Sequence, residues 1–260
     1  MSAPEIGLGS APMAGAASAL VAAMSHVGPE RERNEDAVLL PGVILGAAAQ
    51  GGWSGTIECG SATLVQVIDG MGGHGAGSWA SVLAASTLNE LAAAVPPGLE
   101  PDQGWLASAI QETADTITDV GALKPATRIM GAATAGLMLG HRTVLAFNVG
   151  DCRVYVWEDG YLSLLTTDHR SRAGGGLTRS LGGTGTREVV TPDVVTMDRT
   201  VDRRYLLCSD GLTDTLEFEV LRELIAVDPV TSAASGLVAA AVDAGSHDNV
   251  TVAVVDVGSA

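Results

Sequence analysis

The sequence contains few basic residues. Its 260 residues include 14 lysines and arginines against 30 aspartates and glutamates, which gives a formal net charge of −16 at pH 7. Lys124 is the only lysine. A surface with such an excess of negative charge repels the phosphates of nucleic acids and the headgroups of anionic membranes. We therefore expect neither nucleic acid nor a membrane among the partners of this protein.

Cysteine is also scarce. Cys59, Cys152 and Cys208 form an odd set without a C-x-x-C spacing. This pattern argues against a disulfide framework and against a zinc knuckle, and it favours a reducing cytoplasm.

Long hydrophobic runs are missing as well. The alanine-rich stretch 11–24 is too short to span a bilayer, and no basic segment of the kind found in signal peptides precedes it, because Glu5 is the only charge there. We interpret residues 18–26 as the first strand, after a mobile tail over residues 1–17. With 47% hydrophobic residues the chain can bury a large core. We expect a single catalytic domain over residues 18–258.

Short apolar runs bounded by Gly, Asp or Asn predict strands, and apolar residues at helical spacing predict four helices. The predicted strands are 18–26, 37–40, 61–69, 132–139, 143–149, 153–158, 161–164, 189–197, 204–209 and 249–257. The predicted helices are 77–95, 103–120, 218–227 and 230–244. The glycine-rich stretch 46–60 predicts an irregular insertion. The predicted strands come in clusters with helices between them and do not alternate strictly with helices. This order favours antiparallel sheets flanked by helices over a doubly wound parallel sheet.

Four short acidic motifs lie far apart in the sequence, at residues 34–36, 67–74, 208–214 and 247–251. In three of them an aspartate lies where an apolar run meets a turn residue, which is where a strand end presents a side chain rigidly. Two such carboxylates at ~4 Å repel by about 4 kcal/mol at an effective dielectric constant near 20. A hard divalent cation such as Mg²⁺ or Mn²⁺ removes this repulsion and prefers oxygen ligands.

Each motif taken alone has a simpler interpretation. Asp69 can cap a glycine-rich turn between a strand and a helix, and Asp210 and Asp248 stand in Asp-Gly and Asp-Asn pairs that are common in turns. The glycines at 70, 72 and 73 nevertheless leave the backbone open to a bound ion and to coordination by a carbonyl. The occurrence of all four motifs in one chain favours a metal site.

Six motifs follow one another as R-x-x-x-E-D, D-G-M-G-G-H, G-D-x-R, L-T-R-x-L-G, S-D-G-L-T-D and D-N-V-T. They lie at residues 31–36, 69–74, 150–153, 177–182, 209–214 and 248–251. In this order they resemble the metal-dependent protein phosphatases, the phosphatase 2C family, and particularly its compact bacterial members. The resemblance covers residues 18–257. It implies an α+β fold, a four-layer αββα sandwich of two central antiparallel sheets flanked by helices, with two Mn²⁺ or Mg²⁺ ions at one edge of the sheets.

The resemblance also implies how the ions are held. Asp69 bridges both ions, and the carbonyl of Gly70 binds the second. Asp210 and Asp248 complete the first ion.

The remaining matched positions have supporting roles in the family. Glu35 serves the second ion directly or through water, with Asp36 adjacent, and Asp151 together with the Asp210 position can hold a weaker third ion. Arg31, four residues before Glu35, matches the arginine that binds phosphate, and Arg33 is a competing candidate.

The chemistry of such a centre agrees with these assignments. Two cations roughly 3.5–4 Å apart hold a bridging water and lower its pKa toward ~7, and the resulting hydroxide attacks phosphorus in line. The planar fork of arginine stabilises two phosphate oxygens at once. The resemblance therefore implies a serine/threonine phosphoprotein phosphatase of bacterial signalling, whose substrate is a protein kinase or a kinase-regulated signalling protein. The alternatives are a catalytically inactive fold that serves as a binding module, and a small-molecule phosphohydrolase, for which the sequence shows no base- or sugar-binding signature.

The chain departs from the family pattern at three places. Met71 stands where some members have a histidine proposed as the leaving-group acid, and we expect His74 to serve local packing or capping. Residues 131–134 (GAAT) replace a G-T-T or G-S-T segment. The seven residues 170–176 stand where the family has a longer flap subdomain. We therefore predict a shortened flap and an open cleft, with Arg170 and Arg172 near its rim.

Overall fold

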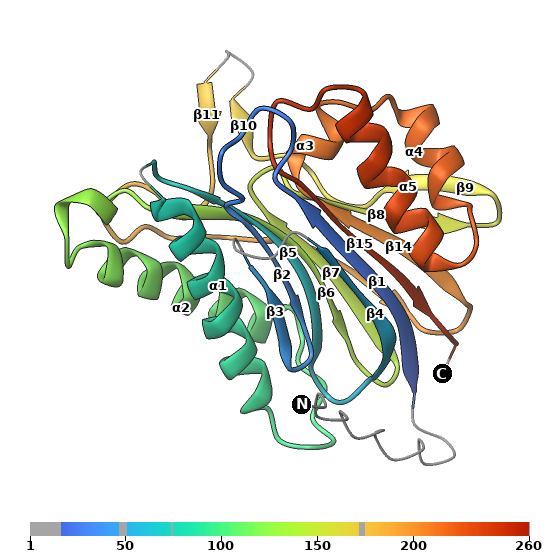
Figure 1. The fold of residues 1–260 in the computed structure, drawn as a ribbon. Coiled ribbons are helices and arrows are strands. Elements are labelled where there is room, and N and C mark those ends of the chain that lie inside the picture. Colours follow the sequence, from blue (N-terminus) through green and yellow to red (C-terminus); the bar gives the residue numbers. More distant parts are fainter. Residues whose placement is uncertain (1–16, 47–50, 74, 172–174, 260) are drawn as a thin grey trace, which may run out of the picture.

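Two antiparallel sheets form the centre of the computed structural model, which describes residues 17–46, 51–73, 75–171 and 175–259 (Figure 1). The first sheet has the strand order β4 (Gly51–Glu58), β1 (Ser18–His26), β15 (Val250–Val257), β14 (Arg203–Cys208), β8 (Arg153–Glu158), β9 (Tyr161–Leu164). The second has the order β13 (Asp193–Asp198), β7 (Thr143–Val149), β6 (Gly131–Leu139), β5 (Thr63–Met71), β2 (Asp36–Leu40), β3 (Val43–Leu45), and β12 (Leu181–Gly182) also pairs with β6. A separate pair joins β10 (Arg170–Ser171) and β11 (Gly175–Leu177).

Helices cover the outer face of each sheet (Figure 1). The helices α1 (Ala76–Ala93) and α2 (Gln103–Gly121) pack on the second sheet, and a 3-10 turn, η1 (Pro125–Thr127), follows α2. The helices α4 (Phe218–Ile225) and α5 (Val230–Asp243) pack on the first sheet, preceded by the short α3 (Asp210–Thr213). The four-layer αββα sandwich predicted from the resemblance is therefore confirmed.

Strand β5 shows how the sequence produces these layers. Successive side chains of a strand point to opposite faces. Val65 and Val67 face the core between the two sheets, whereas Leu64 and Ile68 face the core beneath α1 and α2. A strand with apolar partners on both faces needs a nearly continuous apolar run, and β6 is buried along its whole length.

Most predicted elements agree with the structure to within a few residues, but the prediction for residues 46–60 was wrong. Residues 51–58 form the strand β4, which pairs with β1 from Ser18↔Glu58 to Ser25↔Gly51. β4 is an edge strand, and most of its residues are exposed or half-buried. Its sequence therefore lacks the apolar pattern of a buried strand, and only the pairing with β1 reveals it.

Smaller differences lie at other elements. Residues 189–192, predicted as strand, precede β13. Asp210 and Gly211, for which a turn was the simpler interpretation, begin α3. Residues 1–16 of the predicted tail 1–17, His74 and Arg172 lie outside the described residues. Ala17 is described, and its carbonyl accepts the N–H of Cys59 at 2.7 Å, so the last residue of the predicted tail is held in place. None of the helices in the described part of the chain is both long enough and apolar enough to cross a membrane.

The strand ends that carry the acidic motifs meet at one end of the sandwich. Asp36 at the start of β2 lies directly opposite Asp69 near the end of β5. Asp210 follows β14 at the start of α3, and Asp248 lies two residues before β15. Because β14 and β15 are neighbours in the first sheet, the stacked sheets bring these carboxylates together.

Candidate metal centre

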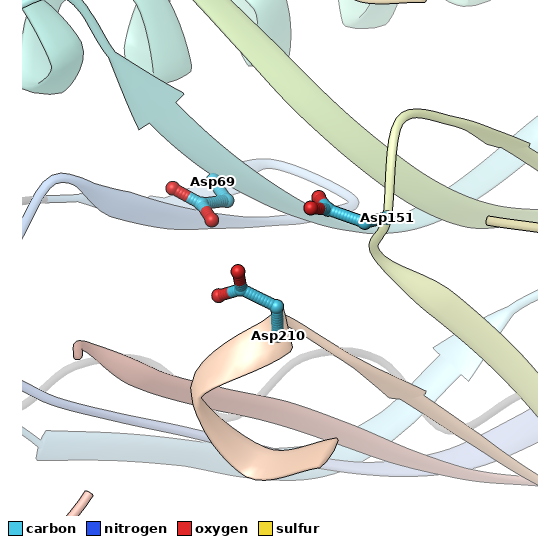
Figure 2. A group of neighbouring side chains, drawn as sticks. All are labelled: Asp69, Asp151 and Asp210. Carbon is cyan, nitrogen blue, oxygen red and sulfur yellow. The ribbon is translucent and has the colours of Figure 1, made fainter. Parts of the chain in front are cut away.

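Three aspartates from distant parts of the sequence converge at this end of the sandwich. Asp69 lies in β5, Asp151 lies in the connection between β7 and β8, and Asp210 is the first residue of α3. One carboxylate oxygen from each lies within 4.8 Å of the others. Figure 2 shows the three carboxylates facing a common space. Such an arrangement of oxygen donors suits a hard divalent cation.

These aspartates lie in a cleft of about 700 Å³. Seven of the eight residues predicted from the sequence line it, namely Arg31, Glu35, Asp69, Gly70, Asp151, Asp210 and Asp248. The eighth, Asp36, is buried behind the cleft.

Asp36 is 1% exposed and accepts a hydrogen bond from the hydroxyl of Ser209 at 2.8 Å. Burial, opposed by hydrogen bonds from Thr251 and Ser209 and assisted by the charges of Asp210 and Asp248, raises the pKa of Asp36 to about 7. Asp36 therefore does not line the cleft. It lies behind the lining carboxylates, and its charge adds to the effect of burial in raising the pKa of Asp69.

The lining carboxylates are also destabilised as anions. Burial first, and then the charges of Asp36, Asp210 and other nearby aspartates, raise the pKa of Asp69 well above its usual range. Burial and the charges of Asp151 and Asp248 raise the pKa of Asp210 to about 6, although Arg170 acts in the opposite direction. Oδ1 of Asp210 is buried and has no hydrogen-bond partner. A buried acceptor without a partner among mutually repelling carboxylates fits a bound divalent cation.

Two glycines allow the backbone to close around the cleft. A Cβ on Gly70 would lie 2.0 Å from the carbonyl oxygen of Gly77, and a Cβ on Gly77 would lie 2.4 Å from that of Gly70 and 2.7 Å from Oε2 of Glu35. The carboxylate of Glu35 therefore lies against the first turn of α1, which has no acidic residue of its own. The partial positive charge of a helix N-terminus stabilises an anion at this place.

Asn249 holds the loop that carries Arg31 and Glu35. Its side-chain oxygen accepts the N–H of Glu35 at 2.7 Å, and its amide donates to the carbonyls of Val27 at 2.8 Å and Arg33 at 2.9 Å. Sequence analysis gave Asn249 no role, although its place in the D-N-V-T motif was a signal for one.

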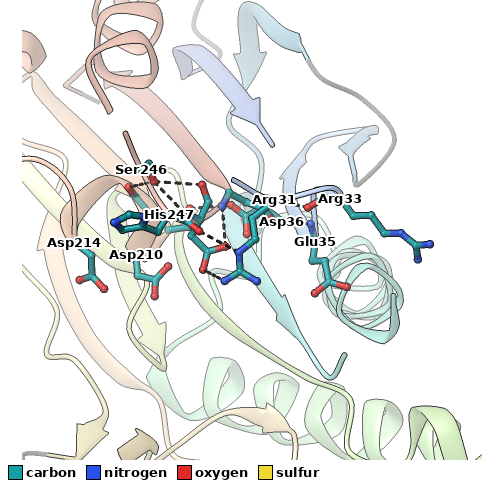
Figure 3. Close-up of polar contacts among 12 residues, drawn as sticks. Arg31, Arg33, Glu35, Asp36, Asp210, Asp214, Ser246 and His247 are labelled. Atoms are coloured by element: carbon teal, nitrogen blue, oxygen red, sulfur yellow. Dashed lines mark hydrogen bonds and ion pairs between the residues drawn. The ribbon is translucent and has the colours of Figure 1, made fainter. Parts of the chain in front are cut away.

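The two candidate phosphate-binding arginines point to different places (Figure 3). Nη2 of Arg31 contacts Oδ2 of Asp248 at 2.6 Å, and its Nε donates to the carbonyl of His247 at 3.2 Å. Arg33 extends beyond Glu35 toward the start of α1, where its Nη1 lies 2.7 Å from the position of a Cβ on Gly75. Both arginines line the cleft, but only Arg31 reaches a carboxylate next to the three converging aspartates.

Sequence reasoning missed the contacts of Arg170, which it placed near the rim. Arg170 forms ion pairs with Asp151, Asp210 and Asp214. The spacing in the sequence could have indicated that Asp214 lies beside Asp210. Asp214 follows Asp210 by four residues, and residues four apart lie on the same face of a helical turn. The contact with Asp151 joins elements that the sequence does not relate.

The three cysteines are free and buried. Cys152 directly follows Asp151, and Cys208 is the last residue of β14, two residues before Asp210. Burial, followed by the charges of Asp69 and Asp151, raises the pKa of Cys152 well above its usual range, and burial raises that of Cys208 to about 12. Thiols with raised pKa values are poor nucleophiles.

Comparison with known proteins gives a consistent assignment. The family model described as "Protein phosphatase 2C" matches residues 48–241. The chain is 32% identical over 215 residues to the serine/threonine protein phosphatase PstP of Mycobacterium tuberculosis, which covers 75% of this chain and 40% of PstP. It is 31% identical over 214 residues to the serine/threonine phosphatase stp of Listeria monocytogenes, covering 74% of this chain and 84% of that protein.

A solved structure extends the similarity to nearly the whole fold. The crystal structure of the catalytic domain of PstP in complex with two manganese ions has a TM-score of 0.75 and 29% sequence identity to this chain. The match covers 93% of this chain and 99% of that domain. The chain spans about two fifths of the length of full PstP, 40%, and therefore corresponds in extent to its catalytic domain.

Proposed function

The chain belongs to the protein phosphatase 2C family, and from that premise we propose that it is a metal-dependent serine/threonine phosphoprotein phosphatase. The observation that supports this best is the convergence of Asp69, Asp151 and Asp210 to within 4.8 Å from three separate segments of the chain. The two manganese ions of the PstP catalytic domain support the same conclusion about the cofactor.

The ligands that we propose are those that the resemblance to the family implies. Asp69 would serve both Mn²⁺ or Mg²⁺ ions, Asp210 and Asp248 would hold the first, and Glu35 and the carbonyl of Gly70 would hold the second. When bound, such a pair of ions supplies Lewis acidity and lowers the pKa of a water molecule toward ~7.

The other residues of the cleft complete the site. Asp36, behind Asp69, adds negative charge and so increases the affinity of the cleft for cations. Arg31 at the mouth binds two oxygens of the phosphoryl group through its planar fork and stabilises the charge that develops on them. Its ion pair with Asp248 positions the guanidinium at the edge of the carboxylate cluster before substrate arrives.

We infer that the substrate is a phosphorylated serine or threonine in a protein, and that the partner is a kinase or a kinase-regulated protein of bacterial signalling. The relatives named serine/threonine phosphatases support the substrate class. The negative charge of the chain argues against nucleic acid and anionic membranes as partners. The three free thiols support a reducing compartment such as the cytoplasm.

A metal-dependent assay tests the proposal. The purified chain, stripped by chelator, is titrated with Mn²⁺ while hydrolysis of a phosphoserine peptide and of 4-nitrophenyl phosphate is followed. We expect no turnover without metal and recovery on addition of Mn²⁺. Binding of Mn²⁺ without hydrolysis of either substrate would indicate a binding module, and undiminished activity in excess chelator would contradict the metal mechanism.

The same assay compares long and short substrates. The short connection between β10 and β11 favours an open cleft, so we expect a short and a long phosphopeptide to be hydrolysed with similar kcat/KM. A strong preference for long phosphopeptides would contradict the shortened flap.

A further inference from the structure

The guanidinium of Arg170 is surrounded by carboxylates on three sides. Its Nε contacts Oδ2 of Asp151, its Nη2 contacts Oδ2 of Asp210, and its Nη1 lies 3.1 Å from Oδ2 of Asp214. Every nitrogen of the guanidinium is therefore used, each on a different aspartate. Three carboxylates that converge in this way on one point require a positive charge there.

The backbone next to Arg170 is hydrogen-bonded to the loop that carries Asp151. The N–H of His169 donates to the carbonyl of Gly150 at 2.8 Å, and the N–H of Gly150 donates to Nδ1 of His169 at 3.1 Å. On the other side, the N–H of Thr178 donates to the carbonyl of His169 at 2.7 Å. These hydrogen bonds hold His169, and with it the backbone of Arg170, beside the loop that carries Asp151.

Arg170 does not use the carboxylate oxygens of Asp210 and Asp69 that are available to an ion in the cleft. It takes Oδ2 of Asp210, whereas Oδ1 of Asp210 is buried and unpartnered. Asp69, the proposed bridging ligand, makes no ion pair with it among the described residues. The two oxygens of the Asp210 carboxylate can therefore serve different cations, with Oδ1 on an ion in the cleft and Oδ2 on Arg170.

We propose that the guanidinium of Arg170 takes the position of a third cation, so that this centre binds two divalent ions and not three. The inference rests on the proposed dinuclear function, and it revises the expectation that Asp151 holds a third ion. The guanidinium of an arginine keeps its proton over the whole pH range in which proteins are folded. Arg170 is therefore a permanent cation at this place, whereas a weakly bound ion depends on its concentration.

The test counts bound metal. Wild type and the Arg170→Gln variant are dialysed against saturating Mn²⁺, and Mn²⁺ per chain is measured by mass spectrometry and by calorimetric titration. We expect two ions in wild type and three in Arg170→Gln, because the neutral side chain leaves Asp151, Asp210 and Asp214 without a cation. The matched control is Arg187→Gln, because Arg187 pairs with Asp115 and Asp119 outside the cleft. That control should keep two ions.

A second substitution tests the carboxylates themselves. Asp214 is no ligand of the proposed pair, and its side chain is 53% exposed, so Asp214→Asn should fold. Adding Asp214→Asn to Arg170→Gln should return the count from three ions to two. Three ions in wild type, or two ions in Arg170→Gln, would overturn the inference.

A crystallographic measurement needs no substitution and therefore remains decisive if Arg170→Gln does not fold. Wild-type crystals grown with Mn²⁺ should show two anomalous peaks beside Asp69, with Arg170 still on Asp151 and Asp214. A third peak between Asp151 and Asp214, with Arg170 displaced, would overturn the inference while leaving the proposed function intact. Failure of wild type to bind any Mn²⁺ would instead remove the proposed function.

Discussion

The side-chain oxygen of Asn249 accepts the backbone N–H of Glu35 at 2.7 Å, although 214 residues separate them in the sequence. The same side chain donates to the carbonyls of Val27 and Arg33. The start of β15 therefore determines where the loop with Arg31 and Glu35 lies. Asp248 precedes Asn249 directly, so a proposed metal ligand and the residue that anchors this loop are adjacent in the chain.

We predict that Asn249→Ala lowers both stability and activity. The substitution leaves three backbone groups without their partner, and each such group costs ~1–3 kcal/mol when buried, so we expect a loss of about 3 kcal/mol in the free energy of unfolding. Misplacement of Arg31 and Glu35 should lower kcat/KM about 10–100-fold. Urea denaturation and steady-state kinetics in saturating Mn²⁺ measure the two effects. Gln103→Ala, which removes one exposed hydrogen bond to Thr196, is the control and should change neither. Unchanged kinetics in Asn249→Ala would contradict the anchoring role.

Asp69→Asn should have opposite effects on activity and on the stability of the metal-free protein. We expect a loss of about a thousandfold or more in kcat, which corresponds to about 4 kcal/mol of transition-state stabilisation by the ions. In chelator, however, the melting temperature should rise, because a buried anion whose pKa is raised by burial and by other carboxylates is replaced by a neutral amide. Kinetics and thermal melts with and without Mn²⁺ test both parts. Asp119→Asn, in an exposed ion pair with Arg187, is the control. A lower melting temperature of Asp69→Asn in chelator would argue against electrostatic strain at Asp69.

The stability of the metal-free protein should depend on pH through Asp36 and Asp210. Their pKa values of about 7 and about 6 in the folded protein exceed the ordinary value of 3.8. Between pH ~4 and ~7 the folded state therefore binds more protons than the unfolded state, so these groups make stability fall as the pH rises through this range. Chemical denaturation in chelator measures the slope.

The Asp36→Asn variant isolates this contribution. Its free energy of unfolding in chelator should fall less between pH 4 and 7 than that of wild type, because one of the responsible groups no longer titrates. Saturating Mn²⁺ should flatten the wild-type curve above pH 6, since bound cations favour the ionised carboxylates. A wild-type curve in chelator that falls no more steeply than that of Asp36→Asn would show that Asp36 is ionised throughout.

Arg31 and Arg33 should differ sharply in their kinetic importance. We expect Arg31→Ala to lower kcat/KM about 100-fold or more, because a charged donor to the reacting phosphate is lost. Arg31→Lys should recover only part of the loss, since an ammonium lacks the planar fork. Arg33→Ala, which removes a guanidinium directed toward Gly75, is the matched control and should stay within about threefold of wild type. Equal losses in the two alanine variants would mean that the contact between Arg31 and Asp248 does not identify the phosphate-binding residue.

Much of the candidate site was predictable because its ligands lie in local motifs. Asp69 follows an apolar run and precedes glycines, and this local pattern places a carboxylate at a strand end whatever the rest of the chain does. The strands themselves were predictable where they are buried on both faces, as β6 is. Strand β4 was not, because an exposed edge strand carries no apolar pattern and is defined by its partner.

The sequence by itself determined which residues can bind a cation and on which strand ends they lie, because short-range propensities and hydrophobic patterns decide local structure. Only the tertiary structure decided which of them meet. It moved Asp36 behind the cleft, directed Arg31 to Asp248 and Arg33 away from it, and placed Arg170 among Asp151, Asp210 and Asp214. These relationships follow from the stacking of two sheets, and such long-range contacts leave no periodic signal in the chain.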